Sequence, residues 1–167
     1  MGTTPNGIVY PDPTGIPQRE ALQDMAESID PSLFAAGNSG MGVLAANWSV
    51  TTATAGNPSG FIAGFTSPGP SAVFIVAYSL SCVCQSATNI VTTAVVDSVG
   101  TISGSQSRAL MPAGATDGSC CISSMARVTG LAAGSQIARP QARLSAAANP
   151  GWTINASEST ITVWRVA

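Results

Sequence analysis

The sequence contains no lysine and no histidine, and charged residues make up only 8% of its 167 positions. Histidine is the commonest general base and metal ligand, so its absence excludes a Ser-His-Asp or Cys-His catalytic arrangement. Without lysine, the chain has neither a P-loop nor a Schiff-base enzyme's nucleophile. A typical soluble domain has about 25% charged residues, so the surface of this chain is unusually poor in charge. Two explanations are predicted. Either partners and further copies of the chain cover much of the surface, or the surface consists of small polar residues, as a GC-rich genome would encode.

Other features of the composition bear on partners and location. The net charge is −2, which provides no basic surface for nucleic acid. No apolar run approaches the roughly 20 residues of a membrane-spanning helix, so no membrane insertion is predicted. The first residues, MGTTPNG, lack the basic and apolar regions of a secretory signal. The sequence predicts a soluble protein made in the cytosol, with no cofactor.

The four cysteines, Cys82, Cys84, Cys120 and Cys121, have a spacing that fits no standard zinc ribbon. On a strand, Cys82 and Cys84 share one face, whereas Cys120 and Cys121 point in opposite directions. Three interpretations follow: small buried apolar residues, which the composition favours, one cross-strand disulfide, or a metal site.

Charge is distributed unevenly along the chain. Residues 1–35 contain five of the eight acidic residues and one arginine, which gives −4, whereas residues 36–167 contain three acidic residues and five arginines, which gives +2. This asymmetry predicts two parts with different roles. We expect residues 1–35 to be a docking segment, residues 36–46 a linker and residues 47–167 a β domain.

The docking segment is expected to begin as an extended arm, because its prolines oppose a helix through residues 4–13. Ile8, Val9 and Tyr10 form an apolar cluster in this arm. A helix is predicted from Pro17 to Ile29, with an apolar stripe at helical spacing that includes Leu22, Met25 and Ile29. A helix this short needs a partner for its stripe, so these six apolar residues are the candidate docking contacts.

The linker contains Gly40-x-Gly42-x-x-Ala45, which superficially matches a dinucleotide fingerprint but follows no predicted strand, so we interpret it as a flexible joint. Beyond it, apolar and β-branched segments alternate with Gly-, Pro- and Asn-rich turns. Such segments are predicted at residues 48–54, 60–65, 71–83, 89–99, 120–129, 136–146 and 160–166. About eight short strands at this spacing predict a mainly β protein, an antiparallel sandwich or jelly roll.

The three tryptophans are the most informative aromatic residues. Trp48 and Trp164 lie in predicted strands and are expected to anchor the core or an oligomer interface. Trp152 follows the turn Asn149-Pro150-Gly151, is expected to be the most exposed, and is the candidate for contact with a ligand or a receptor glycan.

Catalysis has less support, since nothing in the sequence places two of the β domain's three carboxylates together.

Two segments resemble known families. The motif GIVYPDPTG at residues 7–15, followed by REALQDMAESID at residues 19–30, resembles the N-terminal segment of small structural proteins in tailed phages of actinobacteria. Residues 128–136, 151–154 and 159–166 are similar to the end of trimeric jelly-roll heads of the tumour-necrosis-factor and complement type. Together these segments cover about half of the chain. Unlike many such phage proteins, the chain has no Gly-x-y stalk, which favours a compact particle-bound protein over a long fibre.

These resemblances imply a non-enzymatic virion protein of the minor-tail or fibre-like class, made in the host cytoplasm. They imply a homotrimeric head that contacts the host surface, and attachment to other virion proteins through residues 1–35. The alternative is a capsid decoration protein with the same architecture. A third interpretation, from another class, is a carbohydrate-active enzyme on a β scaffold.

Overall fold

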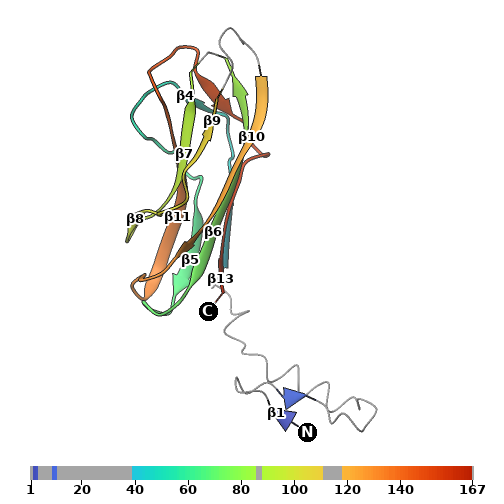
Figure 1. Ribbon diagram of the computed structural model, residues 1–167, viewed down its shortest axis with the longest axis vertical. Helices are drawn as coiled ribbons and strands as arrows, with labels where there is room; N and C mark the ends of the chain where they lie inside the picture. The colour runs from blue at the N-terminus through green and yellow to red at the C-terminus, as the bar shows by residue number, and fades with distance from the viewer. Residues whose placement is uncertain (1, 4–8, 11–38, 86–87, 111–117, 167) are drawn as a thin grey trace. The chain divides into compact units, whose positions relative to one another are not determined.

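The computed structural model describes residues 2–3, 9–10, 39–85, 88–110 and 118–166 (Figure 1). The chain divides into two compact units, Met1–Ala36 and Gly37–Ala167. In the first unit, β1 (Gly2–Thr3) pairs antiparallel with β2 (Val9–Tyr10). Val9 and Tyr10 thus have an extended conformation, whereas the extended arm as a whole stays a prediction. The helix predicted from Pro17 to Ile29 lies outside the described residues.

The second unit, which we call the head, is built from two antiparallel sheets that face each other as two layers (Figure 1). Among the described residues, no helix has the length and apolarity that a membrane crossing requires. The six-stranded sheet contains β3 (Ser39–Val43), β4 (Trp48–Val50), β6 (Phe74–Cys84), β10 (Gly118–Val128), β12 (Trp152–Ile154) and β13 (Thr160–Arg165).

Strand β6 is the centre of the six-stranded sheet. One edge of β6 pairs with β10 over all eleven residues. Its other edge pairs with β13 from Phe74 to Ser79 and with β12 from Cys82 to Cys84. Strands β3 and β4 then pair with β13 and β12 respectively. The short strands β12 and β13 thus lie end to end along this edge of β6, in the place of a single long strand.

The five-stranded sheet contains β5 (Ala63–Ser67), β7 (Ile90–Val96), β8 (Gly100–Thr101), β9 (Ser107–Ala109) and β11 (Gly134–Leu144). Strand β11 lies between β5 and β7, while β8 and β9 pair with the other edge of β7. This arrangement confirms the predicted antiparallel sandwich.

The core forms because strand residues alternate between the two faces of each sheet. Along β6 every second side chain, beginning with Phe74, is buried, and the residues between are half-buried. Phe74 contacts Phe65 of the opposite sheet, with ring centroids 4.9 Å apart. Each fully buried side chain of this size contributes about 1.5–3 kcal/mol. The largest of the other fully buried apolar residues are Phe61, Leu80, Ile90, Leu131, Leu144, Trp152, Ile154 and Ile161.

A buried polar network joins the two sheets across this core. The Tyr78 hydroxyl on β6 donates to the Ser105 carbonyl at 2.8 Å and lies 2.9 Å from the Thr92 hydroxyl on β7. Ser105 in turn donates its hydroxyl to the Ile102 carbonyl and accepts from the Ala94 amide. Burial raises the pKa of Tyr78 above its ordinary value. The network satisfies polar groups that would be costly to bury alone.

The assignment of residues 36–46 to a linker is wrong for most of that range. Ser39–Val43 form β3, an edge strand that pairs with β13, and Leu44 is buried in the core. A Cβ atom on Gly40 would overlap the Gly64 carbonyl, and one on Gly42 would overlap the Ile62 carbonyl. These glycines therefore allow β3 to pass close to β5 of the other sheet, and they do not form a flexible joint.

Replacing Gly42 by alanine is expected to lower the free energy of unfolding by about 1–3 kcal/mol, because the added methyl forces the two strand edges apart. Gly64→Ala is the matched control, since Gly64 is an exposed strand glycine with open space where its Cβ would lie. Denaturant unfolding of both variants measures the difference. Equal losses of stability for the two variants would contradict the close-approach explanation.

Candidate functional site

Trp152 is not exposed, so the prediction of its position was wrong. Its side chain is 1% exposed, and β12 holds it between Val50 of β4 and Cys84 of β6. The indole N–H donates to the Thr88 carbonyl at 2.7 Å, which satisfies its polar atom inside the core. Trp152 anchors the core and has no face available for stacking on a sugar.

The other two tryptophans, Trp48 and Trp164, differ in the face of the sheet that they occupy. Trp48 is partly buried and packs against the core, as predicted for a core anchor. Trp164 is half-buried and, like Thr162, lies on the face of β13 that points away from the core. Its cross-strand neighbours are Ser39 and Ile75. Trp164 is thus available for an interface.

Of the six candidate docking residues in the N-terminal segment, the structure describes two. Val9 and Tyr10 form β2. Ile8, Leu22, Met25 and Ile29 lie outside the described residues. Their role in docking stays a prediction.

The outer face of the six-stranded sheet, which points away from the five-stranded sheet, is the candidate functional site. Its central row runs across β3, β13, β6 and β10 as Met41, Thr162, Ala77 and Met125. Met41 is 69% exposed and Met125 is 65% exposed. Two methionines thus flank a pair of small side chains on an open sheet surface. Methionine adapts its shape to a partner surface more readily than branched residues do.

The rows on either side of the central row continue the same chemistry. One contains Val43, Thr160, Ser79 and Ser123. The other contains Ser39, Trp164, Ile75 and Arg127. Apart from Arg127 in the second of these rows, the side chains are uncharged, so the central part of the surface can approach another surface closely without burying charge.

Charges on this outer face lie near its two ends. Arg127 is opposite Ile75, whereas the Glu158 carboxylate accepts a hydrogen bond from the Ser81 hydroxyl at 2.7 Å. Asn155 donates to the same hydroxyl at 3.1 Å. Six residues of strand, or about 20 Å, separate Ile75 from Ser81 along β6. In the described part of the chain, the middle of the face is therefore uncharged.

The cysteines lie at one end of the β6–β10 pair. Cys82 and Cys84 are buried on the inner face, as predicted, and Cys120 is directly opposite Cys82. Cys121 is exposed, with its sulfur 3.1 Å from the Ser79 hydroxyl. None of the four forms a disulfide in the structure. In the described ranges, no group of three or more His, Cys, Asp or Glu residues is placed to hold a metal ion.

Comparison with known proteins identifies the fold. No protein-family model and no curated protein sequence matches the chain. The Eiger tumour-necrosis-factor protein from S. frugiperda matches with a TM-score of 0.52 and 12% identity, over 77% of this chain and 92% of that chain. This likeness supports the predicted jelly-roll sandwich, and at such low identity it concerns the fold alone.

Two further solved structures resemble the chain more distantly. The globular domain of zebrafish complement 1qA matches with a TM-score of 0.49 and 10% identity, over 76% of this chain and 95% of that chain. Murine APRIL matches with a TM-score of 0.46 and 9% identity, over 75% and 95% respectively.

The buried thiol of Cys82 predicts a pH dependence of stability. Burial, with a smaller effect from Cys120 and Cys121, raises the pKa of Cys82 from 9.0 to about 12. The folded state therefore retains a proton that the unfolded state loses. This contribution to stability is fully present below pH 9 and is lost as the pH rises toward 12.

Cys82→Ala is expected to reduce the loss of unfolding free energy between pH 9 and pH 11 by about 2 kcal/mol relative to the unmodified protein. Cys121→Ala, at an exposed thiol that has only a minor effect on the pKa of Cys82, should change that pH dependence much less. Denaturant unfolding at the two pH values measures both. If Cys121→Ala changes the slope as much as Cys82→Ala does, burial is not the cause.

Proposed function

We propose that this chain is a non-enzymatic structural protein of a tailed-phage particle, of the tail-associated or fibre-like class. Its head forms a homotrimer, and residues 1–35 attach it to other virion proteins. The N-terminal motif, which resembles that of small phage structural proteins, supports the attachment role. The jelly-roll fold of the head supports the trimer.

The observation that carries the proposal is the uncharged centre of the outer face of the six-stranded sheet. Exposed Met41, Val43 and Met125 lie around small side chains there. An isolated head would leave this apolar surface in water, whereas association gains about 25 cal/mol for each Å² of apolar surface buried. A chain with so few charges is suited to covering one face with copies of itself.

The geometry of the head also suits a contact with the host surface. Ser39, at the start of β3, is opposite Trp164 near the end of β13, so the chain enters and leaves the head at the same end. At the other end of the sheet, Cys84 is opposite both Gly118 and Trp152. These residues therefore lie at the end of the head opposite the one at which the chain enters and leaves it. A particle-bound head would present that end outward.

Size measurement tests the trimer directly. In light scattering at micromolar concentration, the full-length protein is expected to have three times the 16.7 kDa mass of one chain. Ala77→Arg places a charge at the centre of the outer face, where burial without a partner costs several kcal/mol, so this variant should be a folded monomer.

Thr66→Arg is the matched control for Ala77→Arg. Thr66 is an exposed strand residue in β5 of the other sheet, so its substitution adds the same charge outside the proposed interface. This variant should remain trimeric. A monomeric unmodified protein, or a trimeric Ala77→Arg variant, would overturn the proposed interface.

Deletion of residues 1–35 tests attachment to the particle. The head is a compact unit from Gly37 onward, so the truncated protein is expected to fold and to keep its oligomeric state but to be absent from purified particles. Incorporation of the truncated protein at the normal level would contradict the docking role. Electron microscopy of particles that carry labelled full-length protein then distinguishes a tail position from decoration of the capsid.

A further inference from the structure

The outer face of the five-stranded sheet, which points away from the core, carries three of the six arginines of the chain. Arg143 of β11 and Arg108 of β9 lie on either side of Val91 of β7, since each of them pairs with it. Arg139 of β11 pairs with Val95, which lies two outward rows further along β7. Neighbouring strands are about 4.8 Å apart, so the backbones of Arg108 and Arg143 lie about 10 Å apart across the sheet.

Two valines of β7 lie next to these arginines on the outer face. Val91 and Val95 occupy outward positions of β7, yet they are only 6% and 9% exposed. The cross-strand neighbours that can cover Val91 are Arg108 and Arg143. Arginine buries its aliphatic stem on apolar surface and keeps its guanidinium in water. The strand register thus holds two guanidinium groups on one surface.

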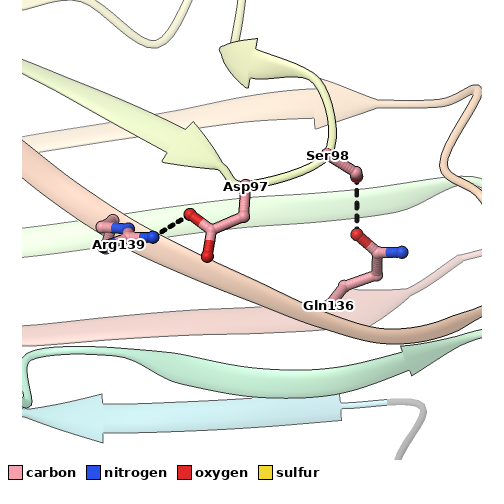
Figure 2. A network of polar contacts seen from close by, with 4 residues as sticks. All are labelled: Asp97, Ser98, Gln136 and Arg139. Carbon is pink, nitrogen blue, oxygen red and sulfur yellow. Dashed lines mark hydrogen bonds and ion pairs between the residues drawn. The ribbon is translucent and has the colours of Figure 1, made fainter.

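Only one of the three arginines has an acidic partner among the described residues. Arg139 forms an ion pair with Asp97 (Figure 2). Ser98, the residue after Asp97, donates its hydroxyl hydrogen to the side-chain oxygen of Gln136. The other described carboxylate of the head, on Glu158, contacts the six-stranded sheet instead. In the described part of the chain, Arg108 and Arg143 therefore present positive charge that no carboxylate neutralises.

Polar groups between the charged rows add hydrogen-bonding capacity. Gln141 of β11 lies between Arg139 and Arg143 along the strand and pairs with Thr93 of β7. These side chains are half-buried, so they are partly available to a ligand. Guanidinium, amide and hydroxyl groups along an open strand surface match a ligand that is extended, anionic and rich in hydroxyls.

We infer that this surface, formed by Arg108, Arg143, Gln141 and Thr93, binds an acidic polysaccharide. Arg108 and Arg143 bind its anionic groups through charge-assisted hydrogen bonds, and Gln141 and Thr93 bind its hydroxyls. A single-stranded nucleic acid fits less well, because the described outward positions of this sheet carry no aromatic side chain for base stacking. The surface lies on the sheet opposite the proposed trimer interface, so it stays open in a trimer.

The overall charge makes the inference sharply testable. The whole chain carries a net charge of −2 and residues 36–167 carry only +2, so the general attraction for polyanions is weak. Binding must therefore depend on this local surface and weaken as salt rises.

Calorimetric titration of the full-length protein with polygalacturonate, a carboxylate polysaccharide, is the direct test. Binding is expected at low salt, and R108Q/R143Q should weaken it by roughly tenfold or more, as expected for the loss of two charge-assisted contacts. Each single variant should have a smaller effect. Neutral dextran should not bind, and thermal unfolding should confirm that the variants are folded.

R19Q is the charge-matched control for R143Q, because it removes one positive charge outside the head. It should leave the affinity unchanged. The inference is overturned if polygalacturonate does not bind, if R19Q weakens binding as much as R143Q does, or if an oligonucleotide binds more tightly than the polysaccharide. None of these outcomes depends on the oligomeric state, so a failure here is distinct from a failure of the trimer.

Discussion

The regular alternation of β6 is the constraint on which the rest of the head depends. Its eleven residues place one set of side chains, from Phe74 to Cys84, in the core and the other set on the outer face. A shift of one residue in its pairing would exchange the two sets completely. Pairing with β10 along its whole length, and with β12 and β13 on the other edge, fixes that register. The side chains of β6 therefore contribute to the core on one face and to the proposed interface on the other.

Two further contacts hold the second sheet in place against β6. The Tyr78 hydroxyl links β6 to Thr92 of β7 and to the Ser105 carbonyl, so the two sheets are joined by polar bonds as well as by apolar packing. At one edge of the sandwich, the glycines of β3 allow its backbone to approach β5 closely. Because the core is well packed and these contacts hold the two sheets together, the outer faces can carry function without a cost to folding.

The sequence was sufficient to predict the fold class and most of the long strands. Continuous β-branched and apolar segments marked β6 and β7 clearly, because their burial in a sandwich demands such residues. Some of the shorter strands, β3, β8 and β9, were missed. Strand β3 contains Gly40 and Gly42, which propensity assigns to a loop, and the reason for these glycines is a carbonyl of another sheet. No local pattern reveals a constraint between residues about twenty positions apart.

Trp152 illustrates the same limit at the candidate site. The Asn-Pro-Gly turn before it suggested exposure, but β12 is inserted between β4 and β6, which turns the indole into the core. The arginines of the five-stranded sheet were equally hidden, since Arg108 and Arg143 are 35 positions apart in the chain and meet only through Val91. Residue types were readable from the sequence, whereas their grouping on a face required the strand register.

The register also gives the two outer faces opposite properties. The six-stranded sheet presents methionine, serine, threonine and alanine across its central rows, which suits contact with another protein surface. The five-stranded sheet presents guanidinium groups over valines, which suits a hydrated anionic ligand. A charge at the centre of the first face would have to be desolvated on association, whereas the arginines of the second remain in water. A chain with so little charge can therefore associate through one sheet and still recognise an anion with the other.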